Sequence, residues 1–208
     1  MRKFFSGKRL TVIFIFVLII GVIVAVRSCA GRKKPDMIIT YIGENYFDSD
    51  RFYAESDRLS GGIDDVNGDG ERIAELVTIS FGTSLTQSQE QNNYTRLTMS
   101  IGGGESRVYI MDKAYAARFA DSEFLADVSE YAGEDALIND AGKVYGISVE
   151  GNGLLRSLGL DDTENVYIAL RAVTELDSAT NDNIARIDAG ARKILQYIIE
   201  ATPHAVLP

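Results

Sequence analysis

The sequence predicts an α/β fold: a single domain with a partly parallel or mixed sheet flanked by helices, preceded by one N-terminal transmembrane helix. Short apolar runs of strand length alternate with amphipathic helical segments, and glycine-containing turns separate them. An uncharged apolar run near the start of the chain indicates a membrane segment that precedes this domain. An α+β domain with a mixed sheet is the alternative interpretation of the same alternation.

The membrane segment comes first. Residues 10–26 read LTVIFIFVLIIGVIVAV and carry no charge. At about 1.5 Å per residue they span roughly 26 Å, slightly less than a bilayer core of about 30 Å. Basic side chains on both sides can extend to the headgroups: Arg2, Lys3, Lys8 and Arg9 before the run, and Arg27, Arg32, Lys33 and Lys34 after it.

Three interpretations of this segment stay open: an uncleaved signal anchor, a signal peptide cleaved near Ala30, and a lipoprotein signal with Cys29 lipidated. Arg27 lies where a lipoprotein signal normally has a small uncharged residue, so the anchor is favoured. Four cations against four do not settle the orientation. A short basic N-terminus before a large domain favours translocation, so we expect a single-pass protein of the cell membrane with its domain outside the cytoplasm.

The chain divides into five parts. We expect a short basic N-terminus at 1–9, the transmembrane signal anchor at 10–26 and a basic linker at 27–36. The extracytoplasmic α/β domain then covers 37–202, and a tail covers 203–208. Cys29 is the single cysteine, so the domain has no internal disulfide.

The first half of the domain contains two predicted strands and two predicted helices. The apolar run 37–42 has strand length, and residues 49–59 then show helical spacing before a Gly-Gly pair. Residues 73–81 alternate apolar and polar side chains as a half-buried strand does. Residues 87–101 carry apolar side chains at spacings of three and four, and the glycines 102–104 end this helix.

The second half repeats the alternation. We expect strands at 107–111, 144–149 and 166–170, where branched and aromatic residues concentrate, and a short helix at 113–120. The final helix, 183–200, carries one apolar stripe made of Ile184, Ile187, Ala191, Ile194, Leu195 and Ile198. Asp182 is placed to cap this helix, and Pro203 to stop it.

Charge is distributed unevenly along the chain. All 30 acidic residues follow residue 34, together with 13 of the 21 basic ones, so the domain carries a net charge of −17. Phosphate backbones and anionic headgroups repel such a domain, and we expect no nucleic-acid partner. Cation binding, or solubility beside a charged envelope, fits this composition.

Residues 97–112, LTMSIGGGESRVYIMD, resemble the helix, glycine turn and strand of bacterial extracellular solute-binding proteins of the ABC-transporter type. Residues 123–128 and GKVYGI at 142–147 resemble later elements of that family, with Ser148 in place of its usual proline. The resemblance covers a quarter to a third of the chain. It implies one lobe of such a protein, a small-molecule ligand and a transport or envelope complex as partner. Because open α/β sheets bind ligands at strand ends, the expected ligand-binding residues are Ser106, Asp112, Gly146 and Ser148.

The sharpest chemical motif is an acidic loop, Asp65-Val-Asn-Gly-Asp-Gly70, which matches the first half of an EF-hand or dockerin calcium loop. The expected Ca²⁺ ligands are Asp65, Asn67 and Asp69 and the main-chain carbonyl of Glu71. The closing carboxylate is missing, because the twelfth position is Leu76. A polar turn without a metal is the alternative.

The sequence contains no recognisable catalytic set. His204, the single histidine, lies in the tail, and Cys29 lies beside the membrane, so a Cys–His pair is not expected. We therefore expect a non-enzymatic, membrane-tethered binding or accessory domain. The alternative is a structural or interaction protein of the cell envelope with a calcium-stabilised loop, and an enzyme of unrecognised type is the third hypothesis.

Overall fold

A computed structural model describes residues 34–59, 63–82, 85–104, 106–133, 135–180 and 182–201. The chain separates into two compact units, of which 35–208 contains all the elements below. The predicted anchor at 10–26, Cys29 and His204 lie outside the described residues. Within the described part of the chain, no helix has the length and apolar character needed to cross a membrane.

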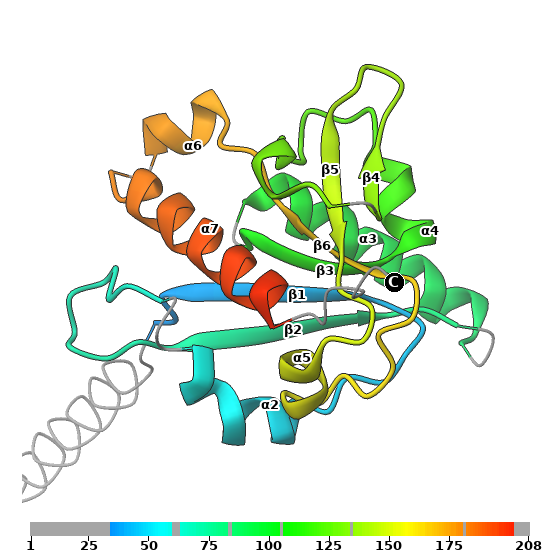
Figure 1. The fold of residues 1–208 in the computed structure, drawn as a ribbon, viewed down its shortest axis with the longest axis horizontal. Helices are drawn as coiled ribbons and strands as arrows, with labels where there is room; N and C mark the ends of the chain where they lie inside the picture. Colours follow the sequence, from blue (N-terminus) through cyan, green and yellow to red (C-terminus); the bar gives the residue numbers. More distant parts are fainter. Residues whose placement is uncertain are drawn as a thin grey trace, which may run out of the picture. The chain divides into compact units, whose positions relative to one another are not determined.

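Six strands form one mixed sheet in the order β2-β1-β3-β6-β5-β4 (Figure 1). Strand β1 pairs in parallel with both β2 and β3, whereas the β3–β6, β6–β5 and β5–β4 pairs are antiparallel. The predicted α/β class with a partly parallel, mixed sheet is therefore confirmed. The strands are β1 (Met37–Gly43), β2 (Ala74–Ser80), β3 (Val108–Asp112), β4 (Ala136–Ile138), β5 (Val144–Ser148) and β6 (Val166–Leu170).

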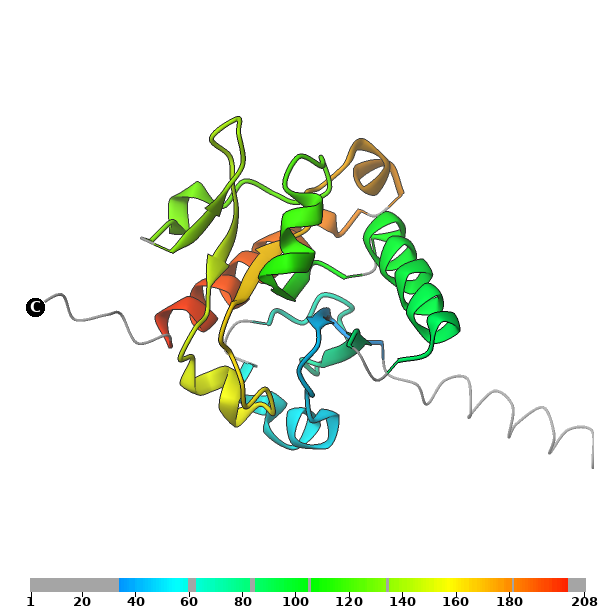
Figure 2. The same ribbon diagram turned by 90° about the vertical axis from the view of Figure 1, so that its right-hand side faces the viewer.

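Helices cover both faces of this sheet (Figure 2). One face packs against α2 (Ser49–Glu55), α5 (Gly153–Ser157) and α7 (Ile184–Glu200) through an aliphatic core. The other face packs against α3 (Gln87–Gly103) and α4 (Lys113–Ala116), with more aromatic side chains. The central strands are buried on both faces, which explains why their sequences are apolar at nearly every position.

Local signals explain the bounds of the long helices. Thr86 and Gln89 form a capping box at the start of α3, and Gly104, with φ of 73°, ends it in the left-handed region. The apolar stripe predicted for the last helix lies in the core, but Asp182 does not cap α7. The N-cap is Asn183, whose side chain makes no capping hydrogen bond.

Other bounds differ from the prediction at short elements. The helix expected at 49–59 ends at Glu55 and continues as a 3-10 turn over Ser56–Leu59. The helix expected at 113–120 becomes α4 and a further 3-10 turn, Ala117–Phe119. Strand β4, helix α5 and helix α6 (Glu175–Thr180) were not expected. These elements have three to six residues, too few for a periodic pattern to be visible.

The outer edge of β2 is covered by side chains. The Phe81 amide donates to the Gly43 carbonyl of β1 at 2.8 Å. The main-chain amides and carbonyls of odd-numbered residues in this segment therefore point toward β1, and those of even-numbered residues point outward, away from β1. Three outward carbonyls accept side-chain hydrogen bonds: Leu76 from Tyr53 at 3.5 Å, Thr78 from Arg96 at 3.4 Å and Ser80 from Asn93 at 2.6 Å. Such covering hinders edge-to-edge pairing with another strand.

Candidate functional site

The carboxyl ends of β1 and β3 form the switch point of the sheet. The chain leaves β1 toward β2 through α2 on one face and returns from β2 to β3 through α3 on the other. The loops that follow β1 and β3 therefore depart in opposite directions. Open α/β sheets bind ligands in the crevice that such a reversal creates.

A hydrogen-bond network occupies this switch point. The Asp112 carboxylate accepts the amide of Glu44 at 2.8 Å and the Tyr41 hydroxyl at 3.3 Å. The Tyr41 oxygen in turn accepts the amide of Asn45 at 3.2 Å. Tyr41 lies over Gly43, where a β-carbon would overlap with the tyrosine hydroxyl and the Asp112 carboxylate. The position after Ile42 therefore has to be glycine for the network to form.

The electrostatics of this edge are strongly negative. Burial, reinforced by Glu44 and Asp162, raises the pKa of Asp112 although its hydrogen bonds act in the opposite direction. Burial and the neighbouring Asp112 charge likewise raise the pKa of Tyr41 well above its usual range. Burial and Glu44 raise the pKa of Tyr115, whose hydroxyl donates to Glu44 at 3.4 Å, to about 12. A cationic or hydrogen-bond-donating group would relieve the repulsion at this edge.

The four expected ligand-binding residues do not share one place. Asp112 ends β3 and Ser148 ends β5, and the two residues pair with the adjacent residues 166 and 167 of β6. Both therefore lie where the carboxyl ends of β3 and β5 meet, at the same end of the sheet. Ser106 precedes β3 at the opposite end, and its hydroxyl donates to the Ile38 carbonyl at 2.9 Å. Gly146 lies inside the sheet opposite Leu137. The structure therefore groups Asp112 with Ser148 and separates Ser106 and Gly146 from them.

The acidic loop folds on its own side chains. Asp65 accepts the amides of Gly68 at 2.6 Å and Gly70 at 2.9 Å. Asn67 accepts the amide of Asp69 at 2.8 Å, and Asp69 accepts that of Glu71 at 2.9 Å. The four residues proposed as calcium ligands thus belong to one compact turn, in which successive side-chain oxygens bind main-chain amides.

A buried carboxylate outside the motif joins the two ends of this loop. Asp36 is 5% exposed and accepts the amides of Val66 at 2.8 Å, Asn67 at 3.2 Å and Ile73 at 2.9 Å. Leu76, at the twelfth position of the motif, is a core residue of β2 whose side chain offers no ligand atom. No group of three or more His, Cys, Asp or Glu side chains within the described ranges is placed to hold a metal ion.

At the other end of the sheet, buried charged side chains tie α6 and α7 to the strands. Arg171 contacts the Asp177 carboxylate at 2.6 Å and donates to the Ile101 carbonyl at 2.8 Å. Arg107 is 1% exposed and lies 3.5 Å from both Asp177 and Asp188. Two buried cations therefore face two carboxylates, which satisfies the requirement that buried charges be paired.

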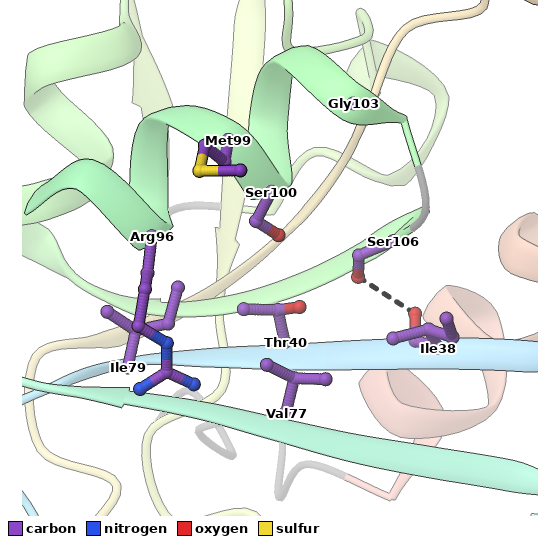
Figure 3. A pocket seen from close by; sticks show the side chains of 9 residues that line it. All are labelled: Ile38, Thr40, Val77, Ile79, Arg96, Met99, Ser100, Gly103 and Ser106. Atoms are coloured by element: carbon purple, nitrogen blue, oxygen red, sulfur yellow. Dashed lines mark hydrogen bonds between the residues drawn. The ribbon is translucent and has the colours of Figure 1, made fainter. Parts of the chain in front are cut away.

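A pocket of about 330 Å³ lies between α3 and the sheet (Figure 3). Its floor is formed by β1 and β2, and α3 forms its roof. The lining residues are Ile38, Thr40, Val77, Ile79, Arg96, Met99, Ser100, Gly103 and Ser106. Thr40 is completely buried, and its hydroxyl has no hydrogen-bond partner within the described part of the protein.

Sequence reasoning missed Tyr41 and Thr40 because both lie inside the first apolar strand. A signal for Thr40 was available: it is the one hydroxyl-bearing aliphatic residue in an otherwise apolar run, on the parity of Ile38 and Ile42. The roles of Arg107 and Asp177 had no local signal, since 70 residues separate them.

Comparisons with protein-family models, curated proteins and solved structures found no match to this chain.

Proposed function

We propose that this chain is a membrane-tethered, extracytoplasmic binding or accessory domain without catalytic activity, related to solute-binding proteins. The observation that carries the proposal is the meeting of Tyr41, Glu44 and Asp112 at the switch point of the sheet, where open α/β sheets bind ligands. The uncharged run at 10–26, bracketed by cations, supports the tether.

The shape of the domain supports an accessory role. A solute-binding protein encloses its ligand between two lobes, and hinge closure supplies much of the buried contact. Residues 35–208 form one compact unit. A single lobe binds a small molecule on an open edge or contributes that edge to a complex, so we expect weak intrinsic affinity and a partner in a transport or envelope assembly.

The charge of the switch point selects the ligand. Asp112 and Asp162 place negative charge beside Tyr41. Glu44 and Asp112 do so beside Tyr115, over whose ring the Arg118 guanidinium already lies at 5.4 Å. Negative charge beside aromatic rings favours a cationic or amino-bearing ligand over an anionic one.

Two measurements test this proposal. The full-length chain, expressed in bacteria, should fractionate with membranes, and its domain should be cleaved by protease added outside the cytoplasm. A thermal-shift screen of residues 35–208 with amino acids, amines and sugars should find a stabilising ligand. Glu44→Gln combined with Asp162→Asn should remove that stabilisation. A wholly cytosolic product, or a stabilising ligand unaffected by the double variant, would contradict the proposal.

The alternative is a structural or interaction protein of the envelope in which Ca²⁺ stabilises the 65–71 loop. The specific observation in its favour is the alternation of Asp65, Asn67 and Asp69 in a turn that Asp36 already holds closed. If the same screen shows a shift with Ca²⁺ that Asp69→Asn abolishes, and none with small organic molecules, this alternative is favoured over the first.

A further inference from the structure

The pocket beneath α3 is separate from the switch point. It opens beside the edge strand β2 and its neighbour β1, and its lining includes neither Asp112 nor Glu44. The nine described residues that line it include no carboxylate, in contrast to the acidic composition of the domain. Its volume of about 330 Å³ is within the range of small-molecule sites, roughly 300–1,000 Å³.

The decisive feature of this pocket is the Thr40 hydroxyl. Thr40 rises from β1 toward α3, below Ser100 and to the left of Ser106 in Figure 3. Its oxygen is buried and has no partner among the described residues, although a buried hydroxyl without a hydrogen bond costs free energy. The neighbouring Ser106 hydroxyl is already donated to the Ile38 and Val108 carbonyls, at 2.9 and 3.2 Å. Thr40 therefore has a donor that none of the described residues around it uses.

The other residues that line the pocket indicate the chemistry of the rest of the ligand. Val77 and Ile79 give an apolar floor, and Met99, with 68% of its surface exposed, lies at the rim. Arg96 also reaches the rim, where its guanidinium donates to the Thr78 carbonyl at 3.4 Å. Two donors along an apolar groove fit a ligand with an apolar body and hydrogen-bond acceptors.

We propose that this pocket is a second binding site, which takes a compact, neutral, mostly apolar molecule carrying an acceptor such as an amide or carbonyl group. The acceptor binds the Thr40 hydroxyl, and the apolar body contacts Val77, Ile79 and Met99. The long-range field of the acidic domain disfavours an anionic ligand, which is why the acceptor is neutral. This site is independent of the switch point and of its ligand.

Benzamide and toluene are suitable probes, because both present an aromatic ring and benzamide alone carries an acceptor. Amide chemical shifts of ¹⁵N-labelled residues 35–208, titrated with each probe, should change in β1, β2 and α3. The wild type should bind benzamide about 2- to 10-fold more tightly than Thr40→Val does, which is the usual worth of one hydrogen bond. Toluene should bind both proteins equally.

Three variants separate binding from structure. Thr40→Val removes an unpaired buried hydroxyl without changing the side-chain shape, so the unliganded protein should unfold at the same temperature or higher. Thr78→Val is the matched control, because Thr78 lies on the opposite face of β2 and should leave benzamide affinity unchanged. Val77→Phe should fill the pocket and abolish binding of both probes. Equal benzamide affinity in wild type and Thr40→Val, or shifts that Val77→Phe does not remove, would overturn the proposal.

Discussion

Asp177→Asn is the substitution whose effect the structure predicts most directly. The Asp177 carboxylate accepts hydrogen bonds from Arg171 at 2.6 Å and from the amide and hydroxyl of Thr174 at 2.8 and 2.9 Å. Burial alone would raise its pKa, but these bonds outweigh burial and lower the pKa from 3.8 to about 2. The side chains of Arg171 and Arg107 are only 4% and 2% exposed. Removing the charge leaves both cations without their shared partner.

The free-energy cost of this loss can be worked out in two ways. Breaking a buried ion pair by removing one partner costs roughly 3–5 kcal/mol, which is a large part of a typical unfolding free energy of about 5–15 kcal/mol. The lowered pKa gives a second figure, because each pKa unit corresponds to about 1.4 kcal/mol. The fall from 3.8 to about 2 thus stabilises the folded state by roughly 2 kcal/mol once the carboxyl is ionised in both states.

The sign of the pH dependence follows from the direction of the shift. A carboxyl with a lowered folded pKa stabilises the protein fully above its unfolded pKa, here 3.8, and loses that contribution as pH falls through about 2. The difference in unfolding free energy between wild type and Asp177→Asn should therefore be largest near neutral pH. It should shrink by about 2 kcal/mol between pH 5 and pH 2.

Urea unfolding of residues 35–208, followed by circular dichroism because the chain has no tryptophan, measures both effects. Asp161→Asn is the matched control: its carboxylate also contacts an arginine, Arg51 at 2.8 Å, but its side chain is 75% exposed. Such surface pairs contribute little to stability. If Asp177→Asn were no more destabilising than Asp161→Asn, or if its cost did not change between pH 5 and pH 2, the account of the buried cluster would be wrong.

Three further substitutions test other parts of the structure. Gly43→Ala should destabilise the domain by at least about 1–3 kcal/mol through overlap at the switch point, whereas Gly102→Ala, with open space around it, should be neutral or stabilising in urea unfolding. Asn93→Ala combined with Arg96→Ala should uncover the outer edge of β2 and increase self-association in sedimentation velocity, and an unchanged monomer would refute the protective role. Asp36→Asn should cost about 2–3 kcal/mol and increase hydrogen exchange of the 65–71 loop amides; unchanged exchange would contradict its role as the anchor.

The sequence predicted the elements that have either a concentrated run of branched and aromatic residues or a long apolar stripe. Strand β6 was predicted with its observed bounds, and α7 began one residue later than expected, because branched residues and an apolar stripe identify them without tertiary information. The α/β class was predicted from the alternation of strand and helix segments along the chain. Strand β4 was missed because three residues cannot show alternation, and its pairing with β5 is decided by the sheet rather than by its own composition.

Long-range pairing limited the prediction of the candidate site. Asp112 was expected at a strand end, and it lies there, but its partner Tyr41 is 71 residues away and looks like an ordinary core aromatic. Ser106 and Asp112 were both expected at the ligand site because they lie at the ends of a predicted strand, where open α/β sheets bind ligands. These two residues lie at opposite ends of β3, a strand of five residues. At about 3.3 Å per residue the strand holds them more than about 15 Å apart, so they cannot contact one ligand.

Helix α3 links two features that would otherwise be unrelated. Through Asn93 and Arg96 it covers the carbonyls of the edge strand, and through Met99 and Ser100 it roofs the pocket above Thr40. A ligand seated in the pocket would press on the same helix that protects the edge. The two roles are separable, because Asn93 lies outside the pocket lining whereas Thr40 makes no contact with the edge carbonyls. If Thr40→Val alters only probe binding and Asn93→Ala alters only self-association, α3 serves the two functions independently. If each variant changes both properties, occupancy of the pocket and exposure of the β2 edge are coupled through this helix.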